Sequence, residues 1–256
     1  MSMICGNIYI AEKTNFGETL YFYRGDINVI NNIDNIDNMR VSCLFSPDNT
    51  LAWEFFQEVE WPWDVLPLIA SYIQKLGVGL DSSEYDKRPD NVWVHKSATI
   101  APGVYIGSDI IIGAGSELRH CAYIRGPALI GKDVVVGNSS EIKNVILFDC
   151  VQVPHYNYVG DSILGFKSHF GAGVITSNVK SDSSFVSVMC GSERLETGLK
   201  KFGAILGDNV EIGCNAVLNP GTVIGPNATV YPLSMVRGFI PANTIYKKQG
   251  EIVEKR

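Results

Sequence analysis

The chain has 256 residues, of which 46% are hydrophobic and 19% are charged, a composition that indicates a globular protein with an apolar core and excludes wholesale disorder. Its net charge is −6, from 21 Lys and Arg against 27 Asp and Glu. Nucleic-acid and membrane partners are therefore not expected, because they need a surface with a basic excess. No stretch is long and apolar enough to span a bilayer.

The first ten residues lack the basic start, the long apolar stretch and the small-residue cleavage site of a secretory signal. Six cysteines are scattered without a Cys-x-x-Cys pair, so neither a zinc ribbon nor a disulfide framework is predicted. We interpret them as reduced thiols of a cytoplasmic protein.

Residues 1–90 are predicted to form a small α+β region that ends in a linker. Residues 5–10 and Thr19–Tyr23 are rich in β-branched and aromatic residues, which indicates two short strands. Residues 28–38 are predicted to be a loop, and apolar spacing predicts a helix over 64–76, with Gly77 just past its end. An aromatic group before that helix is expected to dock the region: Trp53, Phe55, Phe56, Trp61 and Trp63. The polar stretch 81–90 is predicted to be the linker.

From Val94 onward, an aliphatic or aromatic residue recurs at every sixth position. The series is Val94, Ile100, Ile106, Ile112, Leu118, Ile124, Ile130, Val136, Ile142 and Phe148. It slips by one residue before Val153 and again before Leu164, and it resumes from Leu206 to Val236. A period of six fits neither a helix nor a half-exposed strand, but it fits short strands joined by tight corners.

The pattern resembles the hexapeptide-repeat proteins, whose left-handed parallel β-helix forms a triangular prism from coils of 18 residues. The resemblance implies an all-β fold in which the β-helix spans 91–240, with an inserted loop at 179–203 and a cap or tail at 241–256. Residues 18 apart are then expected to stack at the ordinary strand spacing. One inward ladder is predicted to hold Ile106, Ile124 and Ile142, and another to hold Val94, Ile112, Ile130 and Phe148.

Three cations stand where a corner of such a prism usually carries a small residue: Arg119, Arg125 and Lys143. Arg125 and Lys143 are 18 apart, so they are expected to lie on adjacent coils. Two stacked cations repel unless an anion or a carboxylate joins them. A phosphate ligand, an acidic partner such as Glu141, and two merely solvated cations all remain open.

The segment 153–161 contains His155 at the point where the repeat slips. Register breaks expose backbone and redirect side chains, and an imidazole with a pKa near 6.5 suits proton transfer at neutral pH. Farther along, residues 171–178 precede a long excursion that ends near Lys200 and Lys201. We expect this insertion to stand off the prism, where it covers a cleft or reaches a neighbouring subunit.

Four ordered motifs, at 141–144, 154–161, 171–178 and 197–208, resemble the acetyltransferase domain of the bifunctional sugar-1-phosphate nucleotidylyltransferase and glucosamine-1-phosphate N-acetyltransferase enzymes. The resemblance implies acetyl-CoA as co-substrate, no metal for acetyl transfer, an amino-sugar phosphate or nucleotide-linked amino sugar as acceptor, and a homotrimer with sites between subunits. It implies that His155 is the general base. The implied substrate contacts are Arg119, Lys143, Tyr158, Asn178 and His169, and the implied coenzyme A contacts are Ala172, Lys201 and Cys214.

The residue types agree with this chemistry. A sugar ammonium must lose a proton before it attacks a thioester, and a neutral imidazole such as that of His155 can accept this proton. A backbone N–H beside a small residue such as Ala172 suits the resulting oxyanion. Three sites depart from the family. His169 replaces a frequent Asn of the sugar site, Cys214 replaces a small hydroxyl near coenzyme A, and Tyr231-Pro232 replaces small residues in a coil that usually borders the cofactor.

Two other functions remain as alternatives. Residues 1–90 lack the Rossmann-like domain and the Gly-rich phosphate loop of a sugar nucleotidyltransferase, so no such activity is expected, and the chain is compatible with a non-catalytic scaffold or sugar-nucleotide sensor. A γ-type carbonic anhydrase would need three imidazoles that converge on zinc, for which His120, His155 and His169 are the candidates.

Overall fold

The computed structural model describes residues 8–13, 19–23 and 35–255. Its contacts divide the chain into two units, Met1–Asn35 and Ile36–Arg256. In the first unit, β1 (Ile8–Lys13) pairs antiparallel with β2 (Thr19–Tyr23). Residues 5–7 of the predicted first strand and 28–34 of the predicted loop lie outside the described residues.

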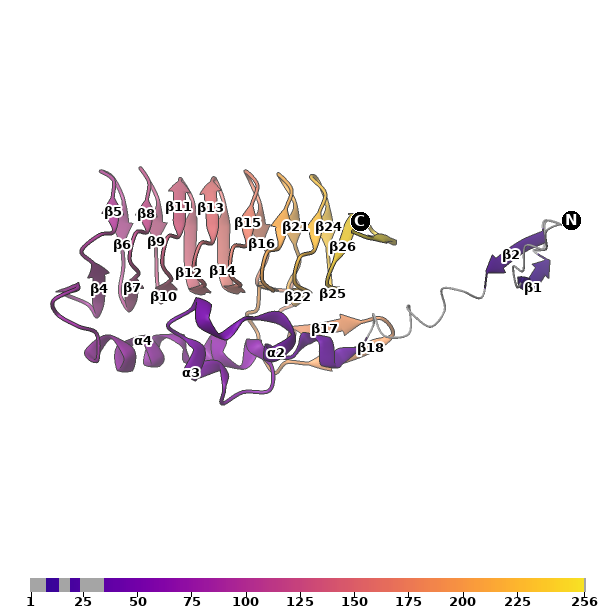
Figure 1. The fold of residues 1–256 in the computed structure, drawn as a ribbon, viewed down its shortest axis with the longest axis horizontal. Coiled ribbons are helices and arrows are strands. Elements are labelled where there is room, and N and C mark those ends of the chain that lie inside the picture. Colours follow the sequence, from indigo (N-terminus) through magenta and orange to yellow (C-terminus); the bar gives the residue numbers. More distant parts are fainter. Residues whose placement is uncertain (1–7, 14–18, 24–34, 256) are drawn as a thin grey trace, which may run out of the picture. The chain divides into compact units, whose positions relative to one another are not determined.

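The second unit is a parallel β-solenoid, which confirms the predicted fold class (Figure 1). Each coil contributes strands to three faces, which we call faces 1, 2 and 3 in chain order. Face 1 holds β4 (Val92–His95), β7 (Ile110–Ile112), β10 (Ala128–Ile130), the second halves of β12 (Glu141–Leu147) and β14 (Tyr158–Leu164), β19 (Ala204–Leu206), β22 (Thr222–Ile224) and β25 (Phe239–Ile240).

Faces 2 and 3 are built from shorter strands. Face 2 holds β5 (Thr99–Ile100), β8 (Glu117–Leu118), β11 (Val135–Asn138), β13 (Gln152–His155), β15 (His169–Phe170), β20 (Glu211–Ile212), β23 (Thr229–Val230) and β26 (Thr244–Lys248). Face 3 holds β6 (Tyr105–Ile106), β9 (Tyr123–Ile124), the first halves of β12 and β14, β16 (Ile175–Thr176), β21 (Val217–Leu218) and β24 (Met235–Val236).

The predicted inward ladders are correct except at one residue. Ile106, Ile124 and Ile142 pair in register, as do Val94, Ile112 and Ile130. The second ladder continues to Leu147, however, and not to Phe148. The repeat therefore shortens earlier than predicted, because the corner at Asn144 turns with a positive φ of 53° and uses one residue fewer.

Phe148 is buried outside the prism interior, where a helical segment covers face 1. Its ring lies 4.8 Å from Phe45 and 5.6 Å from Phe56. The outward residues of face 1 are apolar along the rod, among them Trp93, Ile111, Leu129, Ile146, Ile163, Ile205 and Val223, and all of them are buried. Burial of this apolar row stabilises the helical segment on the rod.

The helical segment consists of η1 (Ile36–Met39), α2 (Val41–Leu44), η2 (Pro47–Asn49), α3 (Trp53–Phe56), η3 (Pro62–Leu68) and α4 (Ile69–Val78). Figure 1 shows it along one side of the rod, and α4 contacts β7, β10 and β12. The predicted aromatic docking is confirmed, since Phe55, Phe56 and Trp63 are buried and Trp63 lies 5.7 Å from Phe202.

The predicted helix over 64–76 was wrong in its bounds. A 3₁₀ segment runs to Leu68 and contains Pro67, which has no N–H to donate, and the α-helix begins only at Ile69. Gly77 lies inside α4 and not past its end. A Cβ there would come within 2.5 Å of the Trp93 ring, so this glycine lets the helix approach the rod.

Both ends of the rod also differ from prediction. The expected linker contains β3 (Tyr85–Arg88), which pairs antiparallel with β4 on the first coil. At the other end, where a cap or tail was predicted from residue 241, the repeat continues through β26, and β27 (Glu251–Glu254) covers it as an antiparallel hairpin. Each added strand satisfies an edge that the stacked coils leave unpaired.

The insertion was predicted to stand off the prism, but it lies along the rod (Figure 1) and packs against it, since Val186, Val188 and Cys190 are buried. It carries an antiparallel hairpin of β17 (Ser187–Cys190) and β18 (Glu193–Glu196).

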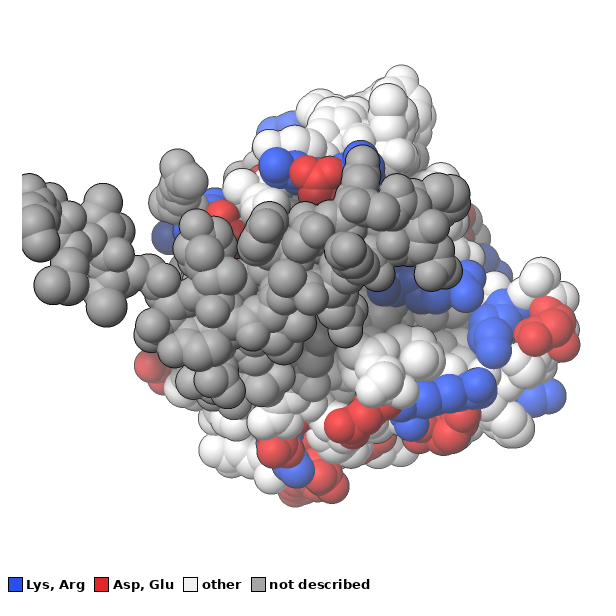
Figure 2. Space-filling model, turned by 90° about the vertical axis from the view of Figure 1, so that its right-hand side faces the viewer, with Lys and Arg blue, Asp and Glu red and all other residues white. Residues whose placement is uncertain are grey.

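Among the described residues, no helix is long and apolar enough to cross a membrane. In the part of the surface that Figure 2 does not draw in grey, basic and acidic side chains are interspersed.

Candidate functional site

Face 3 is bordered by two edges of the prism, and the predicted site residues are divided between them. The edge between faces 2 and 3 carries His155, Ala172 and Cys214 on successive coils. The N–H of Gly173 donates to the carbonyl of His155 (3.0 Å), and the N–H of Asn215 donates to that of Ala172 (2.8 Å). We call this row the His155 edge.

His155 ends β13 with an exposed side chain. Its backbone N–H donates to Oδ1 of Asn157 (3.0 Å), and the buried Asn157 in turn donates to the carbonyl of Gly171 (2.9 Å). Asn157 therefore fixes the backbone of His155, while the imidazole remains accessible to a ligand.

The predicted register break at His155 was wrong. The next residue, Tyr156, has a positive φ of 52°, but so does the matching residue of other coils on this edge: Gly103, Cys121, Ser139, Gly173, Asn215 and Leu233. The corner at His155 is thus a regular corner of the repeat. The shortened corners lie on the other border of face 3, at Asn144 and at Asp161, where φ is 53° and 48°.

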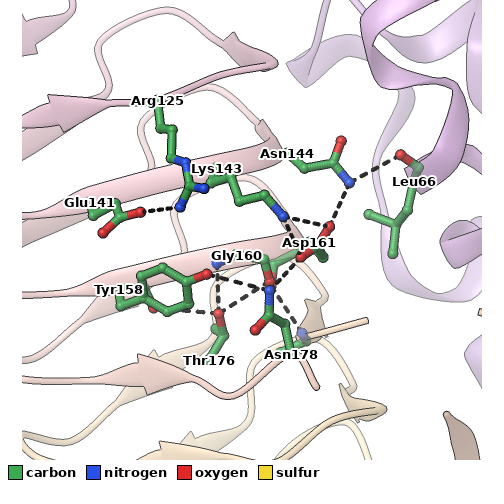
Figure 3. A network of polar contacts seen from close by, with 12 residues as sticks. Leu66, Arg125, Glu141, Lys143, Asn144, Tyr158, Gly160, Asp161, Thr176 and Asn178 are labelled. Atoms are coloured by element: carbon green, nitrogen blue, oxygen red, sulfur yellow. Dashed lines mark hydrogen bonds and ion pairs between the residues drawn. The ribbon is translucent and has the colours of Figure 1, made fainter. Parts of the chain in front are cut away.

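That other border, between faces 3 and 1, is centred on Asp161 (Figure 3). Its carboxylate accepts a hydrogen bond from Nδ2 of Asn144 (2.9 Å) and another from Nδ2 of Asn178, and it pairs with Nζ of Lys143 (3.1 Å). The side chain of Asp161 is 5% exposed and that of Lys143 is 19% exposed. We call Lys143, Asn144, Asp161 and Asn178 the Asp161 corner.

The short coils explain this geometry. Asn144, Asp161 and Asn178 are 17 residues apart, and the register Lys143↔Gly160 and Tyr158↔Ile175 stacks them on successive coils. Two side-chain amides thereby enclose one carboxylate, and the cation on the neighbouring strand balances its charge. Nδ2 of Asn144 also donates to the carbonyl of Leu66 (3.2 Å), which ties the corner to the helical segment.

Tyr158 links the corner to the outer surface of face 3. Its hydroxyl accepts a hydrogen bond from Nδ2 of Asn178 (3.3 Å). Burial, and then the negative charges of Asp161 and Glu141, raise the pKa of Tyr158, so this hydroxyl keeps its proton at neutral pH. Arg125 pairs with Glu141 at 3.2 Å. Of the alternatives left open for the stacked cations, the structure therefore shows an acidic partner for Arg125.

Lys201 lies at the base of the insertion, beside the Asp161 corner. The N–H of Phe202 donates to the carbonyl of Asn178 (3.0 Å), and that of Gly203 donates to the carbonyl of Asp161 (2.8 Å). Phe202 is fully buried against Trp63. The backbone of Lys201 is therefore held next to this corner, while its side chain is exposed.

Two predicted substrate contacts lie outside both clusters. Arg119 pairs with Glu117 (2.9 Å), and His169 pairs through Nδ1 with Glu211 (2.8 Å) on face 2. Conversely, the sequence assigned no role to Asn144 or Asp161, although their spacing of 17, repeated at Asn178, marks them as one row.

A zinc site of the γ-carbonic anhydrase type is not formed by the described residues, which contain no group of three or more His, Cys, Asp or Glu side chains placed to hold a metal. Nδ1 of His120 lies 2.7 Å from the carbonyl of Pro102, and His169 is bound to Glu211. The three candidate imidazoles do not converge.

Known proteins resemble both the fold and the sequence. The family model of the GMPPB C-terminal domain matches residues 122–232, and that of the bacterial transferase hexapeptide (six repeats) matches residues 89–120. The bifunctional protein GlmU of Methanococcus maripaludis is 32% identical over 206 residues, which cover 79% of this chain and 50% of that protein.

A bifunctional sugar-1-phosphate nucleotidylyltransferase/acetyltransferase of Sulfurisphaera tokodaii is 28% identical, over 75% of this chain and 49% of that protein. A solved structure of AntD, an N-acyltransferase from Bacillus cereus in complex with dTDP and coenzyme A, is 15% identical with a TM-score of 0.34, over 68% of this chain and 91% of that one. The chain spans about half the length of the curated relatives it matches. The chain carries hexapeptide repeats in a β-helix fold, and it resembles the acetyltransferase half of the bifunctional GlmU-type enzymes.

Proposed function

We propose that this chain is an acetyl-CoA-dependent N-acetyltransferase whose acceptor is an amino-sugar phosphate or a nucleotide-linked amino sugar. The observation that carries the proposal is the order of residues around face 3. His155 is exposed on one border, Ala172 and Cys214 follow it along the same edge, and the Asp161 corner lies across the face. The acetyltransferase activity named for a relative supports the same reading.

In this proposal His155 is the general base. Its neutral imidazole takes a proton from the sugar ammonium, and the freed amine attacks the thioester carbonyl to form a carbon–nitrogen bond. A backbone N–H next to Ala172 stabilises the oxyanion of the tetrahedral intermediate. When the carbon–sulfur bond breaks, the thiolate leaves and the proton on the imidazolium returns to it.

The cations across face 3 would position the acceptor. Arg125 is half exposed beside Tyr158, and Lys143 lies on the next coil, so a phosphate bound by Arg125 would lie one strand spacing from Lys143. A fixed phosphate holds the amine near His155, which converts an encounter in solution into a reaction within one complex. Lys201 supplies a third positive charge at the base of the insertion.

We further propose that the active form is a homotrimer with the site between subunits. The outward residues of face 3 toward the C-terminal end are exposed and aliphatic: Ile175, Val217 and Met235. Such a row on a rod suits a contact with another copy. Light scattering of the purified chain tests this state, since a monomer mass would contradict it.

The activity is tested by release of the thiol from acetyl-CoA, with glucosamine-1-phosphate, galactosamine-1-phosphate and UDP-linked amino sugars as acceptors. We expect His155→Ala to abolish turnover. His120→Ala is the matched control, because His120 lies on the same edge two coils away and should leave turnover unchanged. Unchanged turnover in His155→Ala would remove this residue from the mechanism, and a UDP-sugar that binds without any turnover would favour the sensor alternative.

A further inference from the structure

Face 3 carries an exposed aromatic row next to the stacked cations. Tyr105 pairs in register with Tyr123, Tyr123 with Glu141, and Glu141 with Tyr158, so these side chains follow one outward row along the rod. Tyr105 is 60% exposed and Tyr123 is 39% exposed. Their rings lie 5.2 Å apart in an edge-to-face arrangement. Nothing in the acetyl-transfer chemistry described above uses these two rings.

We infer that Tyr105 and Tyr123 form a nucleobase subsite and that the acceptor is therefore a nucleotide-linked amino sugar. The inference rests on the proposed acetyltransferase function and selects between its two acceptor classes. Aromatic side chains on an open surface provide flat faces on which a base can stack. Their hydroxyl groups remain wet while the rings supply apolar area.

The guanidinium of Arg125 lies where the diphosphate would follow the base. Arg125 and Tyr123 project outward on either side of the inward Ile124. The hydrogen bond to Glu141 is the main cause that raises the pKa of Arg125, and the charge of Glu141 and the nearby Tyr123 and Tyr158 raise it further. One of the five N–H donors of its guanidinium bonds to Oε1 of Glu141 (3.2 Å). The others suit the oxygens of a phosphate.

The order of residues along the rod matches the order of groups in such a substrate. Adjacent strands are about 4.8 Å apart, so the Tyr105 row lies roughly 10 Å from the Glu141 row and one further spacing from the Tyr158 row. Lys143 belongs to the Glu141 strand, and His155 belongs to the coil of Tyr158. Base, phosphates and sugar amine would thus meet the tyrosines, the cations and His155 in turn, followed by acetyl-CoA near Ala172. A sugar-1-phosphate would leave both tyrosines uncovered.

The same face differs toward its C-terminal end, where the outward residues are the aliphatic Ile175, Val217 and Met235. An aliphatic row suits a second copy of the chain, whereas tyrosines beside a half-exposed arginine suit a ligand that is both aromatic and anionic. Three cations, Arg125, Lys143 and Lys201, stand near two carboxylates, Glu141 and Asp161, which leaves a positive excess for the diphosphate.

The test compares the wild type with the double variant Tyr105→Ala/Tyr123→Ala, using UDP-linked amino sugar and glucosamine-1-phosphate as acceptors. Loss of base stacking should raise the KM for the UDP-linked acceptor about tenfold to a hundredfold and leave the KM for the sugar phosphate unchanged. The matched variant Tyr105→Phe/Tyr123→Phe keeps both rings and should retain the wild-type KM. Equal changes for both acceptors, or no change for either, would overturn the subsite.

Direct binding separates this inference from the proposed function. Titration calorimetry with UDP and with GDP should show a complex with the wild type that weakens about tenfold or more in the alanine variant. If no acceptor is acetylated but this binding pattern holds, the subsite stands and the acetyltransferase proposal fails. If the wild type binds neither nucleotide, or if the alanine variant changes the mass in light scattering, the row is not a nucleotide subsite.

Discussion

The two borders of face 3 are built from the same repeat but hold their side chains in opposite ways. At the His155 edge the corner is regular, and the described contacts of His155 hold its backbone while its side chain faces solvent. At the Asp161 corner the coils are one residue shorter, and a carboxylate only 5% exposed is enclosed by two amides and a lysine. The imidazole of His155 is thus accessible, as the proposed general base requires, whereas the Asp161 corner is held rigidly.

The largest expected effect is the loss of the Asp161 carboxylate. Asp161→Ala leaves the half-buried ammonium of Lys143 without its counter-charge and removes the acceptor of Asn144 and Asn178. We expect the free energy of unfolding to fall by about 3–5 kcal/mol, as for other buried pairs that lose one partner. Urea unfolding followed by circular dichroism measures it.

The matched change on the other border is His155→Ala. Its side chain is exposed, so the free energy of unfolding should stay within about 0.5 kcal/mol of the wild type while turnover is lost. The comparison fails if both variants unfold equally easily, because the two borders would then share one structural role.

Much of this contrast was accessible in the sequence, and the part that was not has a physical cause. The period of six predicted the fold and the inward ladders from Ile106 to Ile142. It located the second short corner, between Val159 and Leu164, but it placed the first one after Phe148, since a step of five between Ile142 and Leu147 is compatible with an apolar Phe148 in the next position. Phe148 is apolar because it faces the helical segment, and hydrophobic character alone does not distinguish that surface from the interior of the prism.

Side-chain pairing was the least predictable feature of the site. The spacing of Arg125 and Lys143 predicted their stacking, and the sequence named Glu141 as one possible partner of the pair, which the structure confirms for Arg125. Lys143 instead bonds to Asp161, 18 residues away on a shortened coil. A register shift of one residue changes which side chains share a corner, so this partner follows from the structure and not from the spacing.

The next prediction concerns the helical segment that the Asp161 corner contacts through Leu66. Gly77→Ala would place a Cβ within 2.5 Å of the ring of Trp93, so α4 must move away from the rod. Overpacking of this kind should lower the free energy of unfolding by about 2–3 kcal/mol. Gly79→Ala is the matched control, since its Cβ would meet only the carbonyl of Leu76 at an ordinary 3.5 Å. Helix propensity favours alanine over glycine and would predict a gain, so a loss in Gly77→Ala no larger than that in Gly79→Ala would show that contact with Trp93 does not decide the outcome.

The two stacked cations provide a finer comparison within one face. Lys143→Met removes a partner of the buried Asp161, which retains its two amide donors, and should cost about 1–2 kcal/mol of unfolding free energy. Arg125→Met removes an exposed pair with Glu141 and should not change the melting temperature measurably. In the activity assay, by contrast, we expect both variants to raise the KM of the acceptor, although only Lys143→Met lowers stability. A normal acceptor KM in Arg125→Met would separate this residue from substrate binding.

The smallest expected effect comes from a second buried carboxylate, Asp208, which accepts hydrogen bonds from the N–H groups of Ser46 (2.8 Å) and Phe166 (2.9 Å). Burial raises the pKa of Asp208 more than these hydrogen bonds lower it. Because the pKa is higher in the folded state, the contribution of this group to stability is complete below the ordinary Asp pKa of about 3.9 and is lost as the pH rises through the raised value. Asp208→Asn does not titrate, so the stability advantage of the wild type over this variant should shrink as the pH rises above the ordinary Asp pKa of about 3.9. An advantage that grows with pH in urea unfolding would mean that the donors from Ser46 and Phe166 stabilise the ionised carboxylate more than burial destabilises it.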